Sequence, residues 1–315
     1  MTDKWFVIVN PVAGYGKGLK DLPVIIKLFR EYNISFDIAF TERKYHATEL
    51  AVSIVGDGYR KIIIVGGDGT LHEVVNGLFI QKEVDPLEVT LAVIATGTGN
   101  DWVRMYGIPL RYTDAVKAIV RGRTFRQDVG LVTYYESKVR QQKYMANVAG
   151  VGFDALVNQQ YNTLKDKGIY SKWIYIGTMV RSVFKYHSSR FEVRVDDKVV
   201  WCGDMFTAAL GIGRYNGGGM RQVPEAIAND GLFDVTVIRK ISNFDIFFNI
   251  RSLYNGHIYK LPQAHHFRGR KIEINATKEE SNVEIDGEAM GMAPFIFETI
   301  DQAITVIVGE KFNVK

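Results

Sequence analysis

The sequence contains a single cysteine, Cys202, and this scarcity excludes an internal disulfide and any metal site built from a cysteine cluster. It has no apolar run long enough to span a bilayer, and its first residues lead into a strand without a signal-peptide pattern. It also has little excess of charge, with a formal net charge of +4. That balance gives no argument for nucleic acid, but it would not repel an anionic membrane surface. We therefore expect a cytoplasmic protein.

The remaining composition is that of an ordinary globular protein. Apolar residues make up 47% of the sequence and charged residues 23%. A chain of 315 residues can build one large domain or two medium domains with real cores.

The most informative stretch is a strand, a glycine turn and a helix start. Ile62–Val65 suits a strand that is covered on both faces, and residues 71–79 place apolar side chains at helical spacing. Between them lies Gly66-Gly67-Asp68-Gly69-Thr70. A helix start offers free N–H groups to an anion, and glycines let backbone approach a phosphate closely. The alternative is an ordinary strand-to-helix turn.

Two better-known phosphate-binding patterns are absent from this stretch. His72 stands where the dinucleotide fingerprint needs its third glycine. No Gly-Lys-Ser/Thr follows the turn, which excludes a P-loop.

Several segments of the first half follow the carboxyl ends of predicted strands. They are Asn10–Gly18, Thr41, Gly66–Thr70 and Thr96–Asp101. Strands and helices alternate here, which favours a parallel sheet with helices on both faces, and ligands bind such sheets at this edge. The sequence thus predicts a three-layer α/β domain over residues 1–128, which residues 300–315 could join.

Residues 129–299 are expected to form a mostly antiparallel β domain. The expected strands cover residues 129–139, 144–148, 190–200, 205–212, 232–239, 271–276 and 283–285. One clear helix is expected, over about residues 169–186. It would pack on a sheet or form the wall of an acyl-chain cleft. The basic segment His265–Lys271 would be a solvated face or a contact for anionic headgroups.

Two acidic segments of the second half could carry chemistry. Pro224–Asp234 could supply an Asp carboxylate and backbone carbonyls as hard ligands for Mg²⁺. Glu284–Glu288 could supply a carboxylate that accepts a proton from a substrate hydroxyl. Both segments contain Asp-Gly, so an ordinary hairpin turn is the alternative for each.

Taken together, these segments resemble the diacylglycerol kinase catalytic-domain family, which has sphingosine and ceramide kinases as relatives. The resemblance covers nearly the whole chain and follows the family's order. It rests on Asn10–Gly14, Gly66–Thr70, Gly97–Asp101, Asn147–Ala155, Pro224–Asp234 and Asp286–Glu288.

The resemblance implies an ATP-dependent lipid kinase with a β-sandwich second domain and an active site in the cleft between the domains. It implies ATP contacts at Asn10, Pro11, Val12, Ala13, Gly14, Thr41, Gly66, Gly67, Asp68, Gly69, Thr70, Leu71, His72 and Thr98. It implies Mg²⁺ on Asp230 with the carbonyls of Ile227 and Leu232, and Asp128 through water. Glu288 would accept the proton, with Asp286 and Asp68 beside the reaction. At His72 this chain departs from bacterial members, which commonly have Asn.

The resemblance leaves the lipid open between diacylglycerol, which is the expected acceptor, phosphatidylglycerol and a sphingoid base. It implies transient contact with an anionic membrane at its inner face, and it is compatible with a homodimer. The competing hypotheses are a metabolite kinase similar to NAD kinase and a lipid-binding protein without activity. Asn10 and Asp286-Gly-Glu288 fit a lipid kinase better than an NAD kinase, and the intact acids Asp68, Asp230 and Glu288 argue against lost activity.

Overall fold

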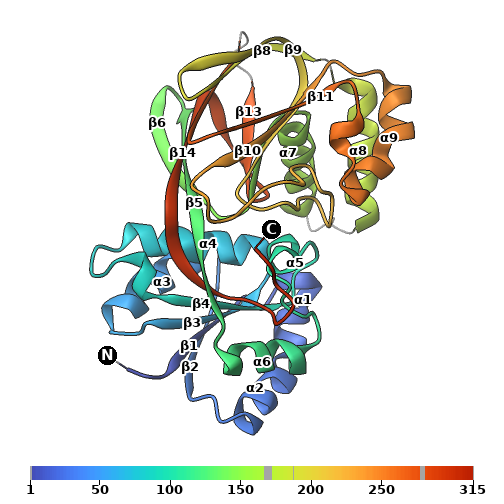
Figure 1. The fold of residues 1–315 in the computed structure, drawn as a ribbon. Coiled ribbons are helices and arrows are strands. Elements are labelled where there is room, and N and C mark those ends of the chain that lie inside the picture. Colours follow the sequence, from blue (N-terminus) through green and yellow to red (C-terminus); the bar gives the residue numbers. More distant parts are fainter. Residues whose placement is uncertain (1, 167–171, 187, 277–280, 315) are drawn as a thin grey trace. The chain divides into compact units, whose positions relative to one another are not determined.

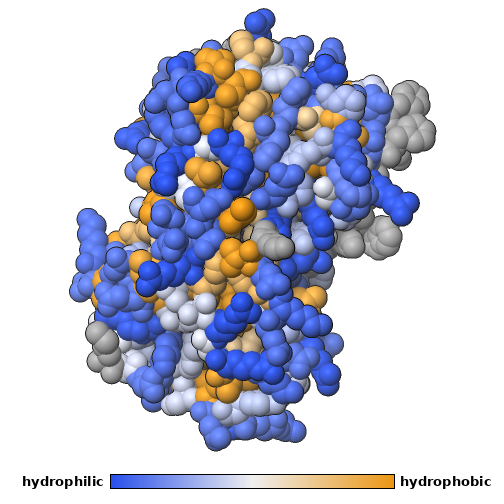
Figure 2. Space-filling view, viewed as in Figure 1, coloured by the Kyte–Doolittle hydropathy of each residue, from blue (hydrophilic) through white to orange (hydrophobic). Residues whose placement is uncertain are grey.

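The computed structural model describes residues 2–166, 172–186, 188–276 and 281–314. The chain divides into two compact units. Unit 1 comprises residues 1–129, 228–230 and 301–315, and unit 2 comprises residues 130–227 and 231–300. Within the described residues no helix is long and apolar enough to cross a membrane. On the face drawn in Figure 2, hydrophilic residues predominate and smaller hydrophobic patches lie among them.

Unit 1 is built around a parallel sheet in the order β2-β1-β3-β4, which the end of β14 extends beside β4. Its elements are β1 (Trp5–Val9), α1 (Ala13–Lys20), α2 (Leu22–Glu31), β2 (Phe36–Phe40), α3 (His46–Gly56), β3 (Lys61–Gly66), α4 (Asp68–Ile80), η1 (Pro86–Glu88), β4 (Thr90–Ala95), α5 (Asp101–Met105) and α6 (Tyr112–Arg121). Strands β5 (Thr124–Glu136) and β14 (Glu288–Ile307) contribute residues to both units.

Helices cover both faces of this sheet, as the alternating sequence predicts (Figure 1). Alternate residues of β1 and β3, such as Val7 and Ile63, pack with Ile25 and Phe29 of α2 in one core cluster. The intervening residues, such as Ile64, are equally buried and face the layer of α3 and α4. The predicted three-layer α/β architecture is therefore confirmed.

Unit 2 is mostly antiparallel β-structure with helices beside it (Figure 1). Its sheet runs β11-β10-β9-β7-β13-β14, and β8 and β12 join β9 to β14. Its further elements are β6 (Val139–Met145), β7 (Val148–Gly152), α7 (Phe153–Asp166), α8 (Lys172–Lys185), β8 (Ser189–Val195), β9 (Lys198–Gly211), β10 (Phe233–Arg239), α9 (Asn243–Asn255), η2 (Ile258–Lys260), β11 (Ala264–Gly269), β12 (Lys271–Ala276) and β13 (Asn282–Ile285).

Several expectations about unit 2 are wrong. The strand expected over residues 129–139 is broken by a turn at Ser137 and Lys138, whose φ angles are +48° and +67°. The strand expected over residues 190–200 is broken in the same way at Asp196 and Asp197, with φ angles of +46° and +68°, and the strand expected over 144–148 is divided between β6 and β7. The expectation of a single helix also fails, because α7 and α9 flank α8. Local signals for α9 were present, since Ser242 caps its start and Gly256 ends it with a φ of +77°. The first residues of the helix expected from residue 169 lie outside the described residues.

Candidate functional site

Three loops of unit 1 lie together at the carboxyl edge of the parallel sheet. They follow β1, β3 and β4, which are neighbours in that sheet. The Asn10 Nδ2 group donates to Thr70 Oγ1 at 3.0 Å, and the Thr96 amide donates to the Gly66 carbonyl at 2.8 Å. The structure therefore brings together three of the four segments that were predicted at this edge.

Glycine is found at these loop positions for different physical reasons. A Cβ on Gly14, where φ is +57°, would stand 1.9 Å from the Thr96 carbonyl oxygen. A Cβ on Gly67 would stand 3.0 Å from Cα of Gly97. These positions need glycine because the loops touch. Gly69 is exposed and has no neighbour within 4 Å of its missing Cβ, so the main chain at the start of α4 is accessible there.

Asp68 joins two of these loops. Its Oδ1 accepts a hydrogen bond from the Trp102 amide at 3.0 Å, and its Oδ2 accepts one from the Asp101 amide at 3.2 Å. The carboxylate therefore caps the start of α5. This position suits a residue that orders the phosphate loop, and contact between Asp68 and a phosphate stays a prediction.

The residues predicted to contact ATP differ in exposure. Thr41, Thr70, Leu71 and His72 are buried, whereas Val12, Gly69 and Thr98 are exposed. The His72 side chain is only 2% exposed, and its Nε2 lies 3.3 Å from Asn76 Nδ2, one helical turn further along α4. A ligand on this edge would meet the main chain of the buried residues more readily than their side chains.

Two carboxylates predicted to bind Mg²⁺ belong to unit 1. Asp128 is completely buried, and its Oδ1 accepts from the Gln302 amide at 2.6 Å. Its own amide donates to the carbonyl of Ala228, two residues before Asp230, at 2.8 Å. Carboxylate and carbonyl oxygens are the hard donors that Mg²⁺ takes. Within the described residues no three His, Cys, Asp or Glu side chains gather as a metal site, so such a site would depend on carbonyls.

In unit 2, Asp286 stands at the tip of the β13–β14 hairpin and fixes that tip in place. Its Oδ2 accepts from the Ala146 amide at 2.8 Å and its Oδ1 from the Asn147 amide at 2.9 Å. Its own amide donates to the Val148 carbonyl at 3.0 Å. Both carboxylate oxygens therefore hold backbone groups, which suits a positioning residue better than a base.

The two glutamates of this hairpin point to opposite faces. Glu284 pairs with Ala289, and Glu288 pairs with Ile285, so the glutamate side chains leave the pleat on different sides. Glu284 is completely buried, and its Oε1 accepts from the Gly287 amide. Glu288 is partly exposed, which leaves it accessible for the predicted role as proton acceptor.

An apolar cavity of about 280 Å³ lies within unit 2. Helices α7, α8 and α9 and strands β9 and β10 supply its wall. Most of the lining is aliphatic or aromatic, and Val157, Val183 and Phe206 also form one core cluster. Its size is near the lower end of the roughly 300–1,000 Å³ typical of ligand pockets. The cleft-wall hypothesis for the helix now assigned as α8 agrees with this lining.

Asp154, the second residue of α7, is the one carboxylate among the described residues that line this cavity. Its Oδ2 accepts from Thr207 Oγ1 at 2.7 Å, and both of its oxygens lie 3.2 Å from Gln222 Nε2. Burial raises the pKa of the Asp154 carboxyl, and the bonds from Thr207 and Gln222 oppose that rise. Asp154 lies within Asn147–Ala155, one of the segments that carry the family resemblance, and no individual role was predicted for it.

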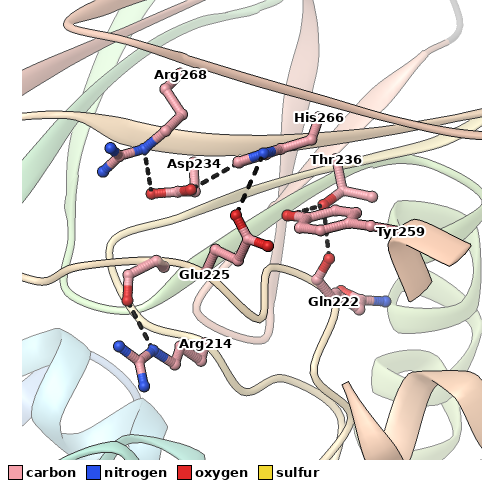
Figure 3. Close-up of polar contacts among 9 residues, drawn as sticks. Arg214, Gln222, Glu225, Asp234, Thr236, Tyr259, His266 and Arg268 are labelled. Atoms are coloured by element: carbon pink, nitrogen blue, oxygen red, sulfur yellow. Dashed lines mark hydrogen bonds and ion pairs between the residues drawn. The ribbon is translucent and has the colours of Figure 1, made fainter. Parts of the chain in front are cut away.

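The basic segment of β11 turns toward a buried acid (Figure 3). His266 Nε2 lies 2.7 Å from Asp234 Oδ1, and Arg268 Nε donates to Asp234 Oδ2 at 3.2 Å. Asp234 is completely buried, and the antiparallel β10–β11 register places it opposite Arg268. The hypothesis of a solvated basic face therefore leaves out this pairing, because a buried carboxylate needs hydrogen-bond partners, and the exposed Arg268 and the partly buried His266 supply them.

The same cluster reaches the start of the segment that contains Asp230. His266 Nδ1 lies 3.8 Å from Glu225 Oε2, and Arg214 Nε donates to the Ala226 carbonyl at 2.7 Å (Figure 3). Both contacts lie within unit 2, and they fix the chain just before Ile227. The sequence could not reveal these partners, because they are 12 to 41 residues away from the atoms that they hold.

Comparisons with known proteins agree with this two-part division. The family described as the diacylglycerol kinase catalytic domain matches residues 4–132, and the YegS C-terminal NAD kinase beta sandwich-like domain matches residues 147–308. YtlR of Bacillus subtilis (strain 168), a protein provisionally named as a lipid kinase, is 28% identical over 92% of this chain and 95% of its own length. A diacylglycerol kinase of Staphylococcus saprophyticus (ATCC 15305) is 26% identical over 95% of this chain and 93% of its own length.

The fold has a solved counterpart as well. The crystal structure described as a diacylglycerol kinase from Bacillus anthracis strain Sterne superposes with a TM-score of 0.72, at 22% identity, over 99% of this chain and 100% of that chain. This likeness concerns the fold. The two matched domains show that the chain belongs to the diacylglycerol kinase catalytic-domain family of lipid kinases.

Proposed function

We propose that this protein transfers the γ-phosphoryl group of ATP to the hydroxyl of a lipid, with diacylglycerol as the expected acceptor. The product would then be phosphatidic acid. Other lipid hydroxyls remain as alternative acceptors, and a metabolite kinase similar to NAD kinase is the alternative outside the lipids.

The apolar cavity of unit 2 is the observation that carries the proposal. Its wall offers Phe153, Val157, Val183 and Phe206, among other apolar side chains, and only a few polar groups. Burial of an acyl chain against such a wall is favoured by roughly 25 cal/mol for each Å² removed from water. A dinucleotide or another polar metabolite would gain nothing from these contacts and would lose hydration.

The loops of unit 1 support the nucleotide part of the proposal. Asn10, Thr70 and Thr96 tie the loops together, and the exposed turn at Gly69 precedes α4. A helix N-terminus with accessible amides suits an anionic phosphate. Asp68 would keep this loop in shape through its bonds to Asp101 and Trp102.

In the proposed reaction the lipid hydroxyl oxygen attacks the γ-phosphorus. A new P–O bond forms, the bond from the γ-phosphorus to the β–γ bridging oxygen breaks, and ADP leaves. Glu288 would accept the hydroxyl proton, and Asp286 would hold the hairpin that carries Glu288. Asp230 and the carbonyls of Ile227 and Leu232 would hold Mg²⁺, with Asp128 joining through water, and the ion supplies charge stabilisation when bound. The interdomain cleft expected for this reaction stays a prediction.

The test is transfer of radiolabel from [γ-³²P]ATP to dioleoylglycerol in mixed micelles, with NAD as the competing acceptor. We expect label in phosphatidic acid and none in NADP. Glu288→Gln should lower kcat by about a hundredfold or more, because general-base catalysis contributes typically 10²–10⁴-fold. The matched control is Glu136→Gln, which removes an exposed acid from the β5–β6 hairpin and should leave turnover unchanged. Label in NADP alone, or full turnover by Glu288→Gln, would contradict the proposal.

A further inference from the structure

We propose that His266 is a positioning residue, which holds both ends of the segment that contains Asp230. One imidazole ring lies between an acid before this segment, Glu225, and an acid after it, Asp234. The residues between the two acids, 226–233, are called the predicted metal segment below. This inference rests on the proposed function, because it takes the segment as the one that holds Mg²⁺. It goes beyond that function by assigning a role to a residue outside the segments that carry the family resemblance.

The end of the segment at Asp234 is held by buried polar contacts. His266 Nε2 lies 2.7 Å from Asp234 Oδ1, and Arg268 Nε donates to Asp234 Oδ2 at 3.2 Å. An ionised carboxylate can only accept, so the imidazole donates from Nε2. Asp234 is completely buried, and these donors offset its lost hydration. Loss of the imidazole donor should therefore favour local opening of the chain that follows the segment.

The end of the segment at Glu225 is held by a weaker contact of the same ring. His266 Nδ1 lies 3.8 Å from Glu225 Oε2, and the Glu225 side chain is 64% exposed (Figure 3). An exposed ion pair of this kind contributes little by itself. The next residue is fixed more firmly, because the Ala226 amide donates to the Val223 carbonyl at 3.1 Å and Arg214 Nε donates to the Ala226 carbonyl at 2.7 Å. His266 thus adds to an end that Arg214 already holds.

The imidazole ring is itself held in one orientation. It stacks on Tyr259, with ring centroids 4.5 Å apart and planes 20° apart. Tyr259 Oη lies 3.0 Å from Thr236 Oγ1, which donates to the Gln222 carbonyl at 2.7 Å (Figure 3). Thr236 is also the register partner of His266 across β10 and β11. The stacked tyrosine fixes the ring plane, so both ring nitrogens stay directed at their acids.

The backbone of the predicted metal segment matters because two of its carbonyls, those of Ile227 and Leu232, are predicted ligands. The place of a carbonyl oxygen is set by the backbone, which the two ends of the segment hold. The backbone is also restricted at Gly231, where φ is +72° and a Cβ would stand 3.1 Å from Arg270 Nη2. Mg²⁺ requires near-ideal octahedral geometry. Loosening either end should therefore weaken metal binding.

The first test is amide hydrogen exchange of the full-length protein without ATP, metal or lipid, followed by mass spectrometry in peptides that cover residues 222–236. His266→Phe keeps a ring against Tyr259 and removes both nitrogens. We expect exchange about tenfold faster than in wild type, because a hydrogen bond to a charged group is worth about that factor in a local opening equilibrium.

The matched control is His265→Phe, which changes the neighbouring histidine of β11. Side chains alternate along a strand, so His265 takes the opposite face, where its ring contacts Trp201. Its Nε2 has no hydrogen-bond partner among the described residues, so the substitution should leave exchange of residues 222–236 unchanged. Unchanged exchange in His266→Phe, or equal acceleration in both variants, would overturn the proposal.

Two milder variants separate the ends of the segment. His266→Gln can still donate to Asp234, so its exchange beyond Phe233 should lie between those of wild type and His266→Phe. Glu225→Gln removes an exposed acid and should speed exchange severalfold at most, at Ala226 and not beyond Phe233. If His266→Phe does not fold, these two variants decide, and wild-type exchange in both would refute the role of His266.

The second test is metal binding, with Mn²⁺ as the probe and free Mn²⁺ measured by electron paramagnetic resonance. Asp230→Asn identifies the binding that depends on the predicted metal segment. We expect His266→Phe to weaken that binding about tenfold, as loss of a group that orients metal ligands typically does, and His265→Phe to leave it unchanged. Wild-type affinity in His266→Phe would refute the positioning role, and so would Mn²⁺ binding that Asp230→Asn leaves intact. Neither test requires turnover, so absence of lipid phosphorylation would count against the proposed function and leave these results standing.

Discussion

The pH dependence of the protein's unfolding free energy tests whether Glu284 is a buried acid with a raised pKa. Replacement by Gln keeps a carbonyl that can accept from the Gly287 amide, and it removes a group that can ionise. The pKa of Glu284 is raised in the folded protein from an ordinary value near 4.5, chiefly by burial. Below that ordinary value both folded and unfolded chains hold the proton, and wild type keeps its full stability.

As the pH rises above the ordinary value, the unfolded chain releases the proton while the folded chain retains it. The unfolding free energy of wild type then falls relative to that of Glu284→Gln until the raised folded pKa is passed. Each pH unit between the ordinary pKa and the raised folded pKa costs wild type about 1.4 kcal/mol, which sets the scale of the difference. For a domain of this size each kcal/mol corresponds to roughly 2–4 °C in Tm.

The assay is urea denaturation of wild type and Glu284→Gln at about pH 4, below the ordinary pKa of 4.5, and at about pH 8. We expect nearly equal stability at the lower pH and a more stable variant at the higher pH. Glu136→Gln serves as the control for an acid on an exposed hairpin, and its difference from wild type should not grow in the same way. A difference for Glu284→Gln that stays flat, or that favours wild type as the pH rises, would refute the reasoning.

Three further changes test other parts of the site. Gly14→Ala places a methyl group against the Thr96 carbonyl at a φ of +57°, and we expect a loss of about 1–3 kcal/mol and weaker ATP binding by calorimetry; wild-type affinity would contradict it. Asp286→Ala leaves two backbone amides without their acceptor, so kcat should fall more than KM changes, and Asp286→Asn should recover part of the loss. Val183→Trp fills the apolar cavity of unit 2. Binding of Nile red, an uncharged apolar dye, should then fall about tenfold while ATP binding persists. Unchanged dye binding would place the lipid elsewhere.

The sequence predicts the parallel sheet and its loops because those signals are local. Apolar runs such as Ile62–Val65 and the glycine turn after them lie next to each other in the chain, and parallel pairing brings the loops to one edge. The antiparallel second half follows from short alternating segments in the same way. The missed turn at Ser137 and Lys138 is a local failure, because neither residue is a usual choice for left-handed backbone.

The roles of individual acids are harder to predict from sequence, because they depend on hydrogen-bond partners that are far away in the chain. Asp286 suggests a catalytic pair with Glu288 by spacing, yet its oxygens hold amides about 140 residues earlier. Asp234 is a strand residue in sequence, and only the β10–β11 register shows that His266 and Arg268 pair with it. Contacts of this kind are set by sheet topology, which single-sequence periodicity does not report.

The β13–β14 hairpin shows how backbone register determines which acid can act. Side chains alternate along a strand, so Glu284 and Glu288 take opposite faces when the turn consists of Asp286 and Gly287. Gly287, with a φ of +91°, and Asp286, with a φ of +49°, both adopt the left-handed backbone of that two-residue turn. If the register of this hairpin shifted by one residue, Glu284 and Glu288 would exchange faces, and the proposed base would be buried. The turn therefore keeps one acid in the protein interior and leaves the other partly exposed, before any ligand is bound.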